Sequence, residues 1–157
     1  MSNKDTIPMM ITVDDGSRRV PIQNIHGEVI GEFTFKPTDV GIVERYNRMV
    51  DEFADITRPL EAFQNAEDGA SEEDDARFLE AEKEARERLF AAVDKLLGSE
   101  GASKAFFGNM NPFSPVGGLF YCENVLQSVG AYISAQFDAE TAKFQSRAAK
   151  YLKKAAK

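Results

Sequence analysis

Residues 98–115 read Gly98-Ser99-Glu100-Gly101-Ala102-Ser103-Lys104-Ala105-Phe106-Phe107-Gly108-Asn109-Met110-Asn111-Pro112-Phe113-Ser114-Pro115. In this stretch Gly, Pro and Asn crowd together with three Phe, between two long segments whose apolar residues recur at helical spacing. Turn-forming residues give a loop a defined shape, and a solvated linker would carry few aromatic side chains. We therefore expect this segment, called the connector below, to be an apolar link of defined shape between two helices.

The segment before the connector is polar on one side and apolar on the other. Ser71 is a suitable N-cap, and Gly98 supplies a C-terminal stop, so we predict a helix from about Ser71 to Leu97. The acidic run that follows Ser71 then lies in the first turn, where carboxylates face the positive end of the helix dipole. The apolar row of this helix contains Phe78, Ala85, Leu89, Ala92 and Leu96.

A third long helix is expected to follow the connector, with Ser114 as N-cap and Pro115 in the first turn. Gly117, Gly118 and Gly130 would then allow another element to pack closely against this helix. Its main apolar row contains Leu119, Cys122, Leu126, Val129, Ile133 and Phe137.

This third helix is too long for the body of one small domain. A helix over residues 115–155 would span roughly 60 Å, whereas a compact domain of this size is about 30–35 Å across. We therefore predict a single α+β domain over residues 1–137. Residues 138–157 form a basic C-terminal helical extension that projects from the body or folds back along it.

The N-terminal part predicts a small antiparallel sheet of three short strands, at Ile7–Val13, Val20–Ile25 and residues 29–35. Asp14-Asp15-Gly16 and Gly27 supply the turn signals between them. Pro37-Thr38-Asp39 then ends the sheet and caps a first helix, which Arg58-Pro59 ends or kinks. The apolar stripe of that helix contains Ile42, Tyr46, Met49, Phe53 and Ile56.

Composition and charge exclude several classes of protein. The chain is 43% hydrophobic with a net charge of −7, which is typical of a globular protein and unfavourable for general nucleic-acid binding. No apolar run approaches the length of a membrane span. A single cysteine and the lack of a signal peptide favour the cytoplasm.

No set of residues in the sequence assembles an acid, a base and a nucleophile. His26 is the only histidine and is expected in a turn, and Cys122 falls on an apolar helical row, which favours a buried side chain. The acidic run Glu72–Asp75 lacks the alternating ligands of a calcium loop, and no glycine-rich phosphate cradle is present. We expect no enzymatic activity, no cofactor and no metal.

The C-terminal extension carries a basic stripe, defined as Lys143, Arg147, Lys150 and Lys154, at spacings of four and three residues. Residues 139–157 hold six basic residues against one acid, whereas residues 61–100 hold 13 acids against five bases. The stripe suits an acidic surface on a partner or on another copy of this chain, and equally suits a solvated helix end.

The order of these parts resembles a known family. A β region that closes in Phe33-Thr34-Phe35-Lys36-Pro37-Thr38-Asp39 leads into Glu44-Arg45-Tyr46-Asn47, and the connector residues 98–108 precede Phe120-Tyr121-Cys122-Glu123. Over about residues 30–137 the chain is similar to small tail proteins of long-tailed bacteriophages and prophages of Gram-positive bacteria, most of all their tail assembly chaperones. The resemblance implies a non-enzymatic protein that binds the tape measure protein in the host cytoplasm before the tail tube polymerises.

Two surfaces are candidates for this contact. The first consists of the connector residues Phe106, Phe107, Met110 and Phe113, and the second is the basic stripe. Two alternatives remain open: a structural tail or virion component that assembles through the same surfaces, and a nucleic-acid-binding regulator that uses the basic helix. Self-association is compatible with each of them.

Overall fold

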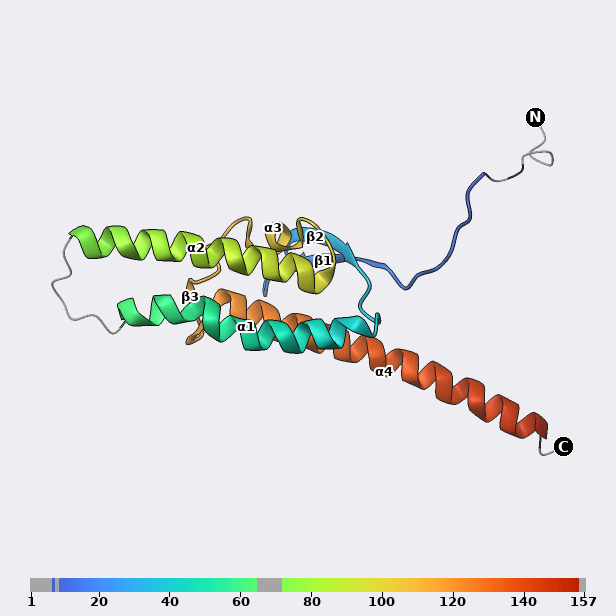
Figure 1. Cartoon of the computed structure of the whole chain (residues 1–157). Coiled ribbons are helices and arrows are strands. Elements are labelled where there is room, and N and C mark those ends of the chain that lie inside the picture. Colours follow the sequence, from blue (N-terminus) through green and yellow to red (C-terminus); the bar gives the residue numbers. More distant parts are fainter. Residues whose placement is uncertain (1–6, 8, 65–71, 156–157) are drawn as a thin grey trace.

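The chain is an α+β protein in which an N-terminal hairpin precedes four helices (Figure 1). The computed structural model describes residue 7, residues 9–64 and residues 72–155. In chain order the elements are β1 (Arg18–Gln23), β2 (Val29–Phe35), α1 (Gly41–Gln64), α2 (Glu72–Leu97), α3 (Ala102–Phe107), β3 (Pro115–Val116), β4 (Leu119–Phe120) and α4 (Tyr121–Ala155).

The hairpin β1–β2 is antiparallel, with Arg18 opposite Phe35 and Ile22 opposite Gly31. The turn between the strands is closed by Asn24, whose side-chain oxygen accepts hydrogen bonds from the backbone N–H groups of His26 and Glu28 at 2.9 and 3.1 Å. Two of the predicted strands are therefore confirmed. The inward face of β2 carries buried phenylalanines, which contact α3 and α4.

The predicted first strand, Ile7–Val13, is wrong for the residues that can be assessed: residues 9–13 and Ile7 form no strand, and Pro8 lies outside the described residues. The reason lies in the turn that follows. Asp14 and Asp15 accept hydrogen bonds through their carboxylates from the N–H groups of Gly16 and Ser17, both at 3.0 Å. Such local side-chain turns compete with a backbone ladder, and the sheet has two strands instead of three.

Helix α1 begins where the sequence predicts, because the Asp39 carboxylate accepts a hydrogen bond from the Gly41 N–H at 3.0 Å. It does not end at Pro59 but continues to Gln64. Proline removes one helical hydrogen bond. The buried side chains of Ile56 and Leu60 on either side of it keep this part of the helix in the core.

The junction between α2 and α3 depends on Asp94. At the end of α2, Ser99 N–H donates to the Asp94 carbonyl at 3.1 Å and Gly98 N–H donates to the Lys95 carbonyl at 3.3 Å, with Gly98 in the left-handed region. This is a Schellman stop. The Asp94 carboxylate also accepts a hydrogen bond from the Ser103 N–H at 2.8 Å. One residue therefore closes α2 and holds the first turn of α3.

Helix α4 begins six residues later than Pro115, the predicted first-turn residue. Strands β3 and β4 pair antiparallel, and Gly117 and Gly118 form their turn with positive φ angles of 63° and 85°. A two-residue hairpin turn favours such angles, so these glycines serve a turn and not the helix packing that we expected. Tyr121 N–H then donates to the Ser114 carbonyl at 2.8 Å as α4 starts.

The close approach expected on this helix is confirmed at Gly130. A Cβ built there would lie 2.5 Å from the Tyr46 hydroxyl oxygen of α1, and that hydroxyl donates to the Leu126 carbonyl at 2.9 Å. Beyond the body of the protein α4 continues outward (Figure 1), and residues 141–150 are all exposed. Among the described residues, no helix combines the length and apolar character needed to cross a membrane.

Candidate partner-binding surfaces

Phe106 and Phe107 lie on the short helix α3, and both are buried. Phe106 packs against Phe33 with ring centroids 5.1 Å apart. Phe107 is stacked on Phe90 of α2 at 5.6 Å and meets the edge of Tyr121 at 5.7 Å. These two predicted contact residues therefore join α3 to the sheet, α2 and α4, and they expose little surface to a partner.

Met110 and Phe113 follow α3 in the loop that leads to β3. The Met110 side chain is 38% exposed. Phe113 is half-buried and meets Phe120 edge-on at 5.7 Å, and its N–H donates to the Asn111 side-chain oxygen at 2.9 Å. Of the four predicted connector residues, Met110 is thus the one with the most surface available for contact.

A groove of about 610 Å³ lies between α2 and the connector. Phe90, Phe107 and Pro112 line it, together with the more exposed Met110. Arg86 and Lys104 contribute basic groups to the same lining. The connector residues Phe107 and Met110 are therefore brought together in one cleft, with Phe106 and Phe113 outside its lining.

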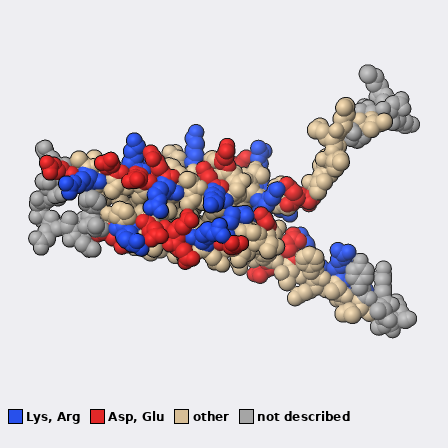
Figure 2. Space-filling view, in the orientation of Figure 1, with Lys and Arg blue, Asp and Glu red and all other residues tan. Residues whose placement is uncertain are grey.

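Asn111 ties the connector to α2 beside this groove. Its side-chain N–H donates to a Glu82 carboxylate oxygen at 2.8 Å, and the same oxygen lies 3.5 Å from Nε of Arg86. The sequence offered no signal for Arg86 or Asn111, because a groove between segments that are distant in the sequence leaves no local pattern. Figure 2 shows acidic and basic side chains interspersed over the visible face of the body, with no large patch of one sign.

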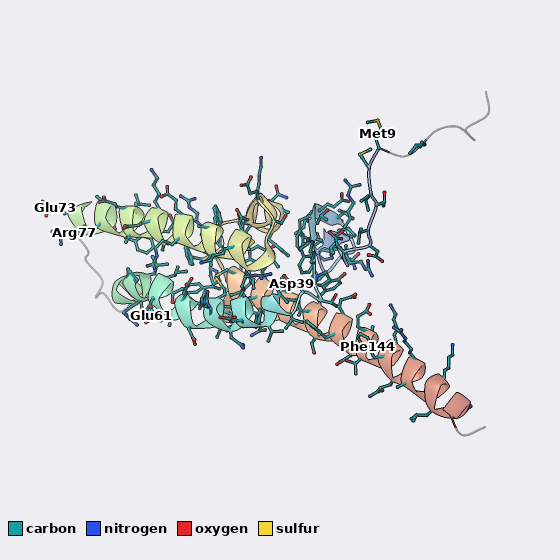
Figure 3. All side chains as sticks on the ribbon, turned by 45° about the vertical axis from the view of Figure 1, so that its right-hand side comes forward. Met9, Asp39, Glu61, Glu73, Arg77 and Phe144 are labelled. Carbon is teal, nitrogen blue, oxygen red and sulfur yellow. The ribbon has the colours of Figure 1, made fainter. Side chains whose placement is uncertain are left out.

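The C-terminal extension presents the second candidate surface. Lys143, Arg147 and Lys150 of the basic stripe are exposed on α4, and Lys143 pairs with Glu140 at 3.2 Å. Lys154 lies in the helical backbone of α4, and its side chain is outside the described residues. Phe144, labelled in Figure 3, is 69% exposed on this same projecting helix.

The structure places the single histidine and the single cysteine of the sequence far apart in character, one exposed and one buried. His26 lies in the β1–β2 turn, as predicted, and is exposed. Cys122 is fully buried at the start of α4, and this burial, with a smaller effect of the Glu123 charge, raises the pKa of the thiol to about 12. Such a thiol is a poor nucleophile at neutral pH. Within the described part of the chain, no group of three or more His, Cys, Asp or Glu is placed to hold a metal ion.

Comparison of the chain with protein-family models, with curated proteins and with solved structures finds no match. The two candidate surfaces are therefore identified from the sequence and structure of this chain alone.

Proposed function

We propose that this chain is a non-enzymatic phage tail assembly chaperone that binds the tape measure protein in the host cytoplasm during tail morphogenesis. The observation that carries the proposal is the groove between α2 and the connector, whose lining contains Phe90, Phe107 and Met110. The resemblance in residues 30–137 supports the same assignment.

The groove suits an apolar helical segment better than a small polar substrate. An amphipathic helix binds a protein groove through apolar side chains spaced three and four residues apart. Methionine adapts its shape to different apolar partners, which fits a partner with many related helical segments. Arg86 and Lys104 beside the groove would favour segments whose polar side is acidic.

A Met110→Glu substitution is expected to weaken binding of tape measure segments at least about tenfold, because a carboxylate in the groove lining must be desolvated when the segment binds. Isothermal titration of the purified chain with helical segments of the tape measure protein measures the change.

Val116→Glu is the matched control. Val116 has the same 38% exposure as Met110 but lies on β3, outside the lining of the groove. Binding that is unchanged in Met110→Glu, or weakened equally by the two substitutions, would remove the groove from the contact. A Met110→Leu chain, which keeps the apolar surface, should bind as the wild type does.

The basic stripe is proposed as a second contact surface for an acidic partner segment. Reversing Lys143, Arg147 and Lys150 to Glu is expected to slow association about tenfold or more at low ionic strength and much less at high ionic strength, since exposed charges act mainly on the encounter rate. Stopped-flow measurements over a salt series test this. If the association rate changed neither with the charge reversal nor with salt, the basic stripe would be a solvated surface that does not contact the partner.

A structural tail component is the alternative proposal, favoured by the projecting α4 and its exposed Phe144. The two functions predict different locations for the chain after the phage tail has assembled. A chaperone is absent from purified phage particles and co-purifies with the tape measure protein from infected cells, whereas a structural component remains in the particle.

A further inference from the structure

The N-terminal arm, defined here as residue 7 and residues 9–13, is an apolar segment in which every residue is exposed. Ile7, Met9, Met10, Ile11 and Val13 are between 72% and 97% exposed. In an extended strand Met9, Ile11 and Val13 would lie on one face, opposite Met10 and Thr12, so pairing as a strand would give the arm an apolar face. Figure 3 shows Met9 far from the helices, on an arm that leaves the body beside the sheet. Isolated exposed apolar side chains are ordinary, but a continuous face of them marks an interaction site.

A surface that matches this arm lies along β1. In the described part of the chain, β1 pairs only with β2, so its outer edge has no strand beside it, and Pro21 within β1 is typical of such an edge. An apolar groove of about 150 Å³ opens between the hairpin and α4. It is lined by Val20, Pro21, Ile22, Phe33, Phe35, Phe106, Ser128, Val129 and Tyr132. Val20 and Ile22 remain only half-buried for this reason.

The arm of the same chain is directed away from this edge. Besides the two side-chain turns at Asp14 and Asp15, the Asp15 carboxylate lies 3.4 Å from the Lys36 ammonium nitrogen, which holds the turn against the chain that follows β2. The arm therefore continues outward from the start of β1 (Figure 1) and does not fold back along it.

We propose that two copies of this chain exchange their arms, each arm adding as an antiparallel strand to the outer edge of β1 in the other copy. Because each copy has one arm and one unpaired β1 edge, a two-fold dimer satisfies both contacts at once. A closed dimer of this isologous kind needs no third component.

One antiparallel register of the arm on β1 fits the side chains. Ile11 comes to lie opposite Val20 and Met9 opposite Ile22, which places the apolar face of each arm on the groove. Asp14 lies opposite Ser17 and beside Arg18 of the second copy. Arg18 is exposed and forms no ion pair with the described residues of its own chain.

Sedimentation equilibrium of the full chain tests the proposal, with an expected mass of twice 17.4 kDa at micromolar concentration. Ile11→Asp is expected to raise the dimer dissociation constant at least about a hundredfold, since an apolar side chain is lost from both grooves. Thr12→Asp adds the same charge to the opposite face of the arm and should leave the dimer largely intact. Both positions are exposed in the single chain, so circular dichroism should show unchanged helix content.

The surface that the arm contacts is tested in a dimer mixed from isotopically labelled and unlabelled chains. Nuclear Overhauser contacts between Ile11 and Val20 are expected only between the two kinds of chain. A monomeric wild type would overturn the proposal, and protected arm amides in that monomer would show that the arm pairs with its own β1. A dimer that Ile11→Asp and Thr12→Asp weaken equally would overturn it as well.

Discussion

Phe107→Ala is expected to lower the free energy of unfolding by about 3–5 kcal/mol, the usual cost of truncating a buried phenylalanine. The ring is stacked on Phe90 and touches the edge of Tyr121. Its loss leaves a cavity where α2, α3 and α4 meet. A domain of this size has a total stability of about 5–15 kcal/mol, so a large fraction of it would be lost. Urea denaturation followed by circular dichroism measures the shift in midpoint.

Phe113→Ala is the matched control, because it removes the same ring from the same connector. Phe113 is half-buried and meets the ring of Phe120, so we expect a loss of only about 1–2 kcal/mol from the smaller buried area. Equal effects of the two substitutions would contradict the separate roles that burial assigns to them. A weakened partner interaction in Phe107→Ala would in any case report on folding, and Met110 is therefore the residue with which to test binding.

The long helices could be predicted from the sequence because their signals are local. The apolar rows of α1 and α2 repeat over several turns, and Asp39 and Gly98 carry the chemistry of a helix start and stop. Residues such as Ile42, Leu89 and Leu96 follow from that periodicity and are buried as expected. In these elements local propensity and tertiary packing favour the same conformation.

The errors arise where pairing or packing decides the structure. The alternation of apolar residues in the sequence of residues 7–13 is that of a strand. A strand also needs the edge of another strand to pair with, and the turn at Asp14 and Asp15 directs this segment away from the edge of β1 in its own chain. Ser114 and Pro115 carry a helix-start signal, but the two glycines that follow prefer a tight turn, which delays α4 until Tyr121. Pro59 stays within α1 because buried neighbours outweigh one missing hydrogen bond.

The candidate site could be predicted only in part for the same reason. The crowding of Phe, Gly and Asn marks the connector as an ordered segment, and Phe107 and Met110 do line a groove. Which rings face inward depends on α3, a short helix whose position is set by Asp94 from α2 and by the sheet. Neither contact can be predicted from the sequence of the connector alone.

Gly31→Ala is expected to destabilise the protein by about 2–3 kcal/mol, the cost of forcing extra volume into a packed region. A Cβ at Gly31 would lie 2.4 Å from the Ala105 carbonyl oxygen and 3.0 Å from its carbon. Both are backbone atoms of α3, so no side-chain rotation can relieve the clash. Either β2 or α3 must move, and the contact between Phe33 and Phe106 moves with it. Thermal denaturation and amide exchange in β2 measure the two consequences.

Gly41→Ala separates this steric effect from the general effect of replacing a glycine. Gly41 also has a negative φ, and a Cβ there would meet the Nη1 atom of Arg45 at 3.0 Å, the far end of a flexible side chain. We expect the stability to be unchanged or raised by up to about 1 kcal/mol, because alanine favours the helix. If Gly31→Ala were as stable as Gly41→Ala, α3 could not rest on the backbone of β2. The packing that buries Phe106 and Phe107 would then be wrong, and both rings would return as candidates for contact with a partner.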